Sequence, residues 1–342
     1  MIAFASDNYA SVHPDVLEAM LRANSGHDVS YGDDAITARL TDVIKDHFGP
    51  LAEAYPVFNG TGANVVALQA ITKRWEAVVC TTNAHVNFDE GGAPEHGGGI
   101  KLWPVPSPDG KITPAGIDSQ AWGFGDVHRA QPGAVTITQS TELGTRYSAD
   151  EIGAIADHVH SLGMHLHVDG ARLSNAAAGL GTGFASFTTD VGVDIVSLGG
   201  TKNGLMLGEA VVVLDPEAAP GVAFLRKSSM QLASKMRFIS AQLLALLTDD
   251  LWLRNAQHAN AMSARLAERV RDLPGLTITQ PVQANAVFAI LPPAVTERLQ
   301  QQFRFYVWDH TTGEVRWMCA WDTSEHDVDD FAAAIAAELS RR

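Results

Sequence analysis

Short runs of apolar residues alternate with longer amphipathic segments between residues 54 and 214. Such runs are typical of buried strands, and the segment at 149–162 has the apolar spacing of a helix. Strands that alternate with helices pair in parallel through crossover connections, so the pattern predicts an α/β fold with a mainly parallel sheet. The predicted strands are 54–58, 78–81, 101–105, 134–138, 166–169 and 194–198, and the predicted helices are 14–23, 35–48, 65–71, 112–123 and 149–162.

The pattern changes near the C-terminus, where short strands and two helices suit a smaller α+β domain. A long helical region begins after Met236, passes through Leu253 and continues to Val270, and it leads into this part. We therefore divide the chain into an N-terminal arm with a large α/β domain, 1–250, and a small C-terminal α+β domain, 251–342. The small domain has predicted strands at 276–279, 286–291, 303–308 and 315–321, and predicted helices at 293–301 and 327–341.

Composition places the chain among large soluble globular proteins. With 342 residues, 46% of them hydrophobic, it can bury a large core, and no apolar run approaches the roughly 18 residues of a membrane span. The N-terminus lacks the basic and apolar regions of a secretion signal, and two cysteines give no disulfide framework, so we expect a cytoplasmic protein. A formal net charge of −15 argues against nucleic acid or anionic membrane as a partner.

A single lysine, Lys202, stands on the glycine-rich loop after the predicted strand 194–198. An ordinary loop lysine keeps its amine in water. At the end of a buried strand the amine would be partly desolvated and its pKa lowered, which makes Lys202 a candidate Schiff-base nucleophile.

An acidic residue, Asp169, ends the predicted strand 166–169. Ligands of open α/β sheets bind beyond the carboxyl ends of the strands. The carboxylate could also cap a helix that begins at Ala171, and Arg172 could form an ordinary surface ion pair. A lysine together with an acidic partner for a pyridinium nitrogen is what pyridoxal 5'-phosphate requires.

The sequence NGTGAN at 59–64 follows the first strand of the large domain and precedes a helix. Small residues such as Gly60 let a ligand approach the backbone, and the helix N-terminus offers free N–H groups to a phosphate. Thr61 or Asn64 could instead simply cap the helix. The motif is neither a Walker loop nor GxGxxG, which disfavours a nucleotide.

One histidine, His85, is a candidate for chemistry. His85 lies just past the strand 78–81, where an imidazole could stack on a cofactor ring or transfer a proton, or could be a hydrogen-bonded structural residue. His128 lies in a polar stretch before the strand 134–138. We find no convincing metal-ligand spacing among the histidines and acids of this region.

Several further polar residues admit two interpretations. Lys235 and Arg237 could belong to a solvated helix face or could reach a phosphate, including that of a neighbouring subunit. The polar loop around Tyr31 could be a linker or an arm that reaches an active site. Arg316 lies in an apolar strand, and because a buried unpaired arginine is costly, it must meet an acid of the protein or a ligand carboxylate.

These motifs occur in an order that resembles the low-specificity L-threonine aldolases, especially the phenylserine-aldolase-like branch. The resemblance covers nearly the whole chain and rests on SDNY, SYGDD, NGTGAN, AHVNFDE, HVDGARLSNA, SLGGTKNG, QLASKMRF and VRWMCAWDT. It implies a pyridoxal-phosphate enzyme of the aspartate-aminotransferase fold type. It also implies a homodimer or a dimer of dimers, with active sites at a dimer interface.

The resemblance implies roles for residues that would hold the cofactor. Lys202 would form the internal aldimine, Asp169 would pair with the pyridine nitrogen and His85 would stack on the ring. The phosphate would be bound by Gly60 and Thr61.

It implies a second group of residues around the substrate and the shared interface. Ser6 and Arg316 would hold the substrate carboxylate, and Arg172 would contact the cofactor or the substrate. His128 would lie near the β-hydroxyl. The substrate-binding set includes Tyr31, while Lys235 and Arg237 would approach the phosphate from the other subunit.

The implied reaction is retro-aldol cleavage of an external aldimine, which releases glycine and an aldehyde from an L-β-hydroxy-α-amino acid such as threonine, allo-threonine or phenylserine. The base could be His85, His128 or a water molecule held by them. The alternatives are another pyridoxal-phosphate enzyme on the same scaffold, such as a β-eliminating lyase or a serine hydroxymethyltransferase-like protein. A more remote alternative is a non-catalytic ligand-binding protein.

Overall fold

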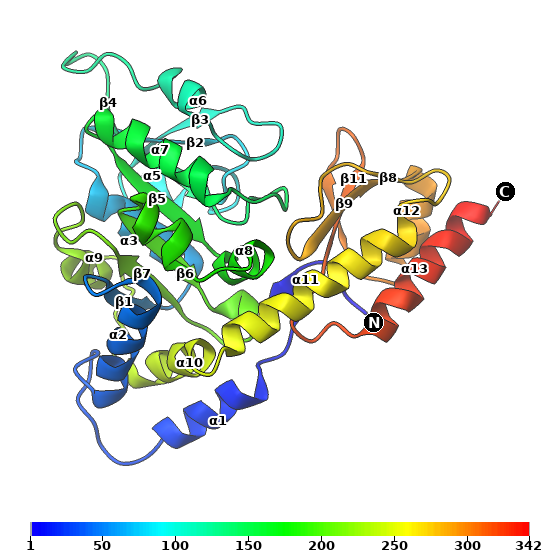
Figure 1. Cartoon of the computed structure of the whole chain (residues 1–342), viewed down its shortest axis with the longest axis horizontal. Coiled ribbons are helices and arrows are strands. Elements are labelled where there is room, and N and C mark those ends of the chain that lie inside the picture. Colours follow the sequence, from blue (N-terminus) through cyan, green and yellow to red (C-terminus); the bar gives the residue numbers. More distant parts are fainter. Residues whose placement is uncertain (1, 342) are drawn as a thin grey trace.

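A central seven-stranded sheet organises the large part of the molecule (Figure 1), as described by a computed structural model that covers residues 2–341. All strands except one antiparallel member, β7, run in the same direction, which confirms the predicted mainly parallel α/β fold. In spatial order the strands are β1 (Glu53–Val57), β7 (Glu209–Val213), β6 (Ile195–Gly199), β5 (His165–Gly170), β4 (Gln131–Thr138), β2 (Glu76–Thr81) and β3 (Lys101–Val105).

Strand register aligns the carboxyl ends of the parallel strands along one edge of this sheet. Thr138 pairs with Asp169, and Asp169 pairs with Ser197. Glu209, at the start of β7, pairs with both Val57 and Gly199. The loops that follow β1, β4, β5 and β6 therefore emerge side by side, as a ligand site of an open α/β sheet requires.

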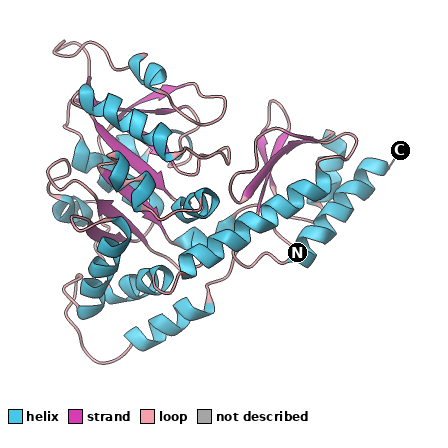
Figure 2. Ribbon diagram, viewed as in Figure 1, coloured by secondary structure: helices cyan, strands magenta, loops and turns pink. Residues whose placement is uncertain are grey.

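Helices cover both faces of the sheet, as Figure 2 shows. Neighbouring strand residues alternate between two cores: Val79 faces one and Val78 the other. The helices of the first face are α1 (Pro14–Ala23), α2 (Ala35–Phe48), α7 (Ala149–Ser161), α8 (Leu173–Leu180) and α10 (Arg237–Leu247). Those of the second face are α3 (Gly60–Ile71), α4 (His85–Phe88), α5 (Ala93–His96) and α9 (Val222–Ser228).

A second, smaller sheet forms the C-terminal part and is antiparallel throughout. Its strands are β10 (Tyr306–Asp309), β11 (Glu314–Met318), β9 (Ala286–Ile290) and β8 (Thr277–Ile278), and its helices are α11 (Leu251–Val270), α12 (Pro293–Gln300) and α13 (Glu325–Ser340). The helix α11 links both parts (Figure 1), because Trp252 packs in the large core and Leu266 in the small one. Phe4 also packs in the small core, although the predicted division assigns it to the large domain.

Two predicted helices differ from the structure. The long helical region is broken between α10 and α11, where Asp249 and Asp250 adopt positive φ, which a helix does not allow. Of the helix predicted at 112–123, only α6 (Pro114–Asp118) forms. No helix within residues 2–341 combines the length and apolarity that crossing a membrane requires.

Candidate active site

A cavity of about 270 Å³ opens where the carboxyl edge of the large sheet meets the small domain. It brings together residues from seven separate segments of the chain, and both predicted cofactor and predicted substrate residues are among them. The lining residues are Ser6, Asn8, Tyr9, Asn83, His85, Phe88, Asp89, Glu142, Arg172, Lys202, Tyr306, Trp308 and Arg316.

Lys202 lies in the cavity wall, on the single turn η4 (Thr201–Asn203) that follows β6. The glycines before it are required by close packing, since a Cβ on Gly199 would lie 2.4 Å from the carbonyl oxygen of Ala171. Burial and the nearby Arg172 guanidinium lower the pKa of the Lys202 amine. The amine makes no hydrogen bond or ion pair within residues 2–341, and its residue lines the cavity.

Asp169 is buried at the end of β5. Its Oδ2 accepts a 2.8 Å hydrogen bond from Asn64 Nδ2, and its Oδ1 accepts one of 3.0 Å from the Ala171 N–H. The following helix α8 begins at Leu173 with no side-chain cap, so Asp169 is not a helix cap. Instead, Asn64 of α3 orients its carboxylate.

His85 begins α4 and reaches the cavity. Its Nδ1 lies 2.8 Å from Oε1 of Glu90, a glutamate with a fully buried side chain. That hydrogen bond raises the pKa of the imidazole, although burial alone would lower it. Asn64 Nδ2 also donates to Glu90 Oε1. The amide of Asn64 therefore links the carboxylate of Glu90 to that of Asp169.

Arg172 is held by a residue that sequence reasoning gave no role, Asp7. Its Nε lies 2.7 Å from Asp7 Oδ2 and its Nη2 lies 2.9 Å from Oδ1, which is the two-pronged geometry of a strong ion pair. Asn285 Nδ2 donates a third hydrogen bond to Asp7. The surface ion pair considered for Arg172 is therefore a buried one, and it ties the N-terminal segment to the cavity wall.

Arg316 meets no acid of the protein within residues 2–341. Its guanidinium lies 4.3 Å above the Trp308 ring, and Nη2 donates to the Ala5 carbonyl at 3.3 Å. Its Nε is buried without a partner. Burial and the Arg172 charge lower the pKa of Arg316 to about 10. Of the two partners expected for this arginine, a ligand carboxylate remains, and Ser6 lies in the same cavity.

The first turn of α3 offers a second anion site at the same sheet edge. Asn59 caps the helix by accepting from the Gly62 N–H at 2.8 Å, and the N–H groups of Gly60 and Thr61 have no partner within residues 2–341. Nothing lies within 4 Å of a Cβ placed on Gly60, so a phosphate can approach the backbone there. Thr61 does not cap the helix.

His128 lies away from the cavity of its own chain. It precedes β4, whereas Asp169 pairs with Thr138 at the far end of that strand. β4 has 8 residues and spans roughly 25 Å. His128 is exposed on a loop at the amino edge of the sheet, and it does not reach the cavity of its own chain.

Three further predicted residues lie together away from this cavity. The Tyr31 N–H donates to the Ser234 carbonyl, beside Lys235, while Arg237 donates to the Gly26 carbonyl on the same exposed loop. Lys227 lies 4.9 Å from the Tyr31 ring. Within one chain this group does not contact Lys202, so a role in catalysis requires a second subunit.

Sequence reasoning missed Glu142, whose side chain also lines the cavity. It comes four residues after the end of β4, within the segment TQSTELG. Its signal was similar to the one that identified Asp169, an acid at the carboxyl end of a parallel strand.

Comparisons with known proteins agree on one group of enzymes. A family model described as "Beta-eliminating lyase" matches residues 3–292. A low-specificity L-threonine aldolase from Pseudomonas sp. (strain NCIMB 10558) is 44% identical over 339 residues, covering 98% of each chain. One from Pseudomonas aeruginosa is 44% identical over 334 residues, covering 97% of this chain and 96% of the relative. A solved threonine aldolase structure from Leishmania major superposes with a TM-score of 0.93 at 28% identity, covering 99% of this chain and 100% of that one.

Proposed function

This chain belongs to the low-specificity L-threonine aldolase family, and on that premise we propose that it cleaves L-β-hydroxy-α-amino acids to glycine and an aldehyde. Members of the family are pyridoxal-phosphate-dependent aldehyde-lyases. The substrates are L-threonine, L-allo-threonine and related compounds such as phenylserine. The observation that carries the proposal is a single cavity with a free buried amine, Lys202, and a guanidinium without an acidic partner, Arg316.

The residues of the cavity and of the neighbouring strand ends fit pyridoxal 5'-phosphate as cofactor. Lys202 would hold its aldehyde carbon, Asp169 its ring nitrogen, and the N–H groups of Gly60 and Thr61 its phosphate, while His85 would cover the ring. When bound, this cofactor withdraws the electron pair that bond cleavage leaves on the substrate. Asp169 supports that role because a carboxylate held by Asn64 keeps a ring nitrogen protonated.

Arg316 and Ser6 would bind the carboxylate of the substrate. The guanidinium has a free edge and is fixed against Trp308, so a substrate carboxylate is bound in one orientation. Arg172 keeps its position through Asp7 and lines the same cavity. Fixing the carboxylate and the amine of one substrate determines which bond at Cα is aligned for cleavage.

Aromatic rings surround the region left for the substrate side chain. Phe88 and Tyr306 are 78% and 42% exposed and lie beside Trp308 in the cavity lining. Such a wall suits an apolar or aromatic group on Cβ as well as a methyl group.

The active unit contains at least two copies of the chain in this proposal. Tyr31, Lys235 and Arg237 would serve the cavity of the partner subunit, since they do not reach their own. The assembly is then a homodimer or a dimer of dimers. Basic side chains from the partner would add positive charge beside the phosphate site at Gly60.

The deciding experiment is aldehyde release from L-threonine by the protein loaded with pyridoxal phosphate. We expect acetaldehyde and glycine in equal amounts. The second candidate, a β-eliminating lyase, is favoured by the description of the matching family model, and it would release 2-oxobutanoate and ammonia instead. Those products without glycine would replace the proposal by the second candidate.

A further inference from the structure

Glu142 presents a carboxylate oxygen that the protein leaves unused. Its Oε1 accepts hydrogen bonds from the His85 N–H at 2.8 Å and from the Thr138 hydroxyl at 2.7 Å. Its Oε2 is buried and has no partner within residues 2–341. An unsatisfied buried carboxylate oxygen is costly, so one is expected where a ligand supplies the missing hydrogen bond.

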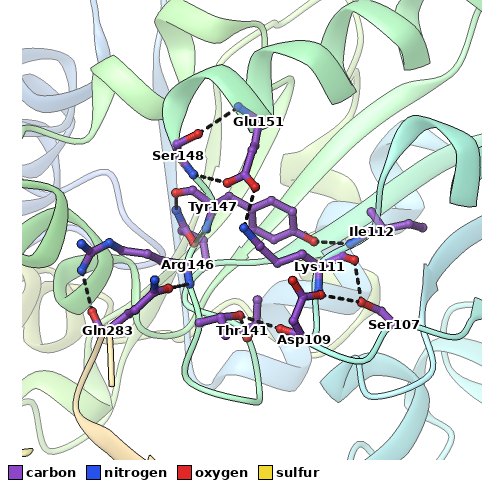
Figure 3. A network of polar contacts seen from close by, with 12 residues as sticks. Ser107, Asp109, Lys111, Ile112, Thr141, Arg146, Tyr147, Ser148, Glu151 and Gln283 are labelled. Carbon is purple, nitrogen blue, oxygen red and sulfur yellow. Dashed lines mark hydrogen bonds and ion pairs between the residues drawn. The ribbon is translucent and has the colours of Figure 1, made fainter. Parts of the chain in front are cut away.

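The loop that carries Glu142 is held rigidly on both sides. The side-chain amide of Gln139 bonds to the Tyr147 N–H and carbonyl, which closes the loop into a compact unit. Figure 3 shows how its far side is anchored, with Tyr147 accepting from the Ile112 N–H and Arg146 donating to the Gln283 carbonyl. A carboxylate on such a loop is positioned before the substrate arrives.

Charged and titratable groups from several elements face this carboxylate. On the cavity side are the cations Lys202, Arg172 and Arg316. On the sheet side are Asp169 of β5 and Cys80 of β2. Tyr147, on the loop that carries Glu142, is also near, as is His85 with its partner Glu90. Burial, reinforced by the charge of Asp169, raises the pKa of Glu142, although the Thr138 and His85 hydrogen bonds lower it. A carboxylate whose pKa is raised is a better proton acceptor.

The other candidate bases are less suited to this position. His128 lies at the opposite edge of the sheet. His85 uses Nδ1 to contact Glu90, and its ring is the group that would cover the cofactor. Glu142 lies in the cavity wall with Lys202 and Arg316, the residues that would fix the substrate amine and carboxylate.

We infer that Glu142 is a catalytic residue of the proposed aldolase reaction, the base that takes the proton of the substrate β-hydroxyl. The inference rests on the proposed function. The O–H bond breaks and its proton goes to Oε2 of Glu142, while the C–O bond becomes the aldehyde carbonyl. The Cα–Cβ bond breaks and its electron pair stays on Cα, where a bound cofactor would delocalise it. Formation of glycine requires one proton at Cα. Because Glu142 has received one proton from the hydroxyl, the reaction balances without another proton donor.

The test compares two reactions in the Glu142→Gln protein loaded with pyridoxal phosphate. Cleavage of L-threonine needs a base for the hydroxyl, whereas exchange of the glycine Cα proton with D₂O, followed by NMR, does not. We expect kcat for threonine cleavage to fall on the order of 10²- to 10⁴-fold, with KM little changed and glycine exchange retained. Equal loss of both reactions, or cleavage near the unsubstituted rate, would overturn the assignment.

The pH profile provides a second readout that a structural role would not affect. Cleavage by the unsubstituted protein should fall as the pH drops through the pKa of Glu142, and this acid limb should disappear in Glu142→Gln. In Thr138→Val, which keeps the carboxylate but removes a hydrogen bond that lowers its pKa, the limb should move to higher pH. If the loss of activity at low pH stays at the same pH in both variants, the inference is contradicted. An unsubstituted protein that exchanges glycine protons but releases no aldehyde contradicts the proposed function instead.

Discussion

Asp7 and Arg172, which are 165 positions apart in the chain, form a bidentate ion pair with distances of 2.7 and 2.9 Å in the wall of the cavity. Both side chains are largely buried, and Asn285 donates a further hydrogen bond to the carboxylate. The pair joins the N-terminal segment, the end of β5 and the small domain. Its strength therefore bears on the stability of the molecule and on the shape of the site.

Substituting Asp7 by Asn should destabilise the protein, because it leaves the Arg172 guanidinium without its counter-charge. The expected loss is about 3 to 5 kcal/mol, the usual result of breaking a buried pair from one side. Urea unfolding monitored by fluorescence would measure it. Substitution of Asp15, an exposed acid of α1, gives the matched control with little effect.

The same pair predicts a loss of stability in acid. Burial alone would raise the pKa of Asp7, but the Arg172 charge and hydrogen bonds lower it below its ordinary value. The pair therefore contributes fully above the unfolded-state pKa of about 3.9, and its contribution disappears as the pH falls through the lower folded-state pKa. Asp7→Asn should flatten the pH dependence of stability in this range, and an unchanged curve would argue against the pair as its source.

Replacing Lys202 by Ala should remove the visible absorption band of lysine-bound pyridoxal phosphate and leave the fold intact. The reason is that Lys202 makes no hydrogen bond or ion pair within residues 2–341, so no structural interaction is lost. Absorption spectra and far-ultraviolet circular dichroism measure the two effects. Retained cleavage of threonine in this variant would show that Lys202 is not the cofactor lysine.

Arg316→Ala should weaken substrate binding more than it slows the chemical step. A carboxylate partner stabilises ground and transition states alike, so KM should rise while kcat changes less. A hydrogen bond to a charged group contributes about 1.5 to 3 kcal/mol, which corresponds to roughly a 10- to 150-fold increase. The comparison is Arg304→Ala, an exposed arginine that contacts Tyr9. An unchanged KM for Arg316→Ala would mean that the guanidinium does not bind the substrate.

Glu90→Gln should lower the pKa of His85 as measured by NMR titration. The Glu90 hydrogen bond is the main cause of the raised pKa of this imidazole. A histidine with a raised folded-state pKa adds stability below its unfolded-state value of about 6.5, and this stability is lost as the pH rises through the folded-state pKa. The variant should lose that part of the pH dependence. A His85 pKa that stays raised would place its cause elsewhere.

The sequence identified some of the candidate site residues and missed others. Lys202, Asp169 and Gly60 were identified because each lies at or shortly after the end of a predicted strand, and the carboxyl ends of parallel strands meet at one edge. Arg316 was identified because a charge in an apolar strand needs a partner. His128 was given a role only by the family resemblance, and it precedes its strand, while Glu142 follows the same strand and lies in the cavity.

Periodicity and the order of strands and loops are local properties of the chain, so they were enough to predict the mainly parallel sheet, a smaller α+β domain, and the places of Lys202 and Asp169 at strand ends. The packing of distant segments was needed to show that Asp7 holds Arg172, that Asn64 links Asp169 to Glu90, and that Arg316 lacks an acid within residues 2–341. Those relationships join segments far apart in the chain. They depend on how helices and sheets pack, to within the few ångströms over which hydrogen bonds form.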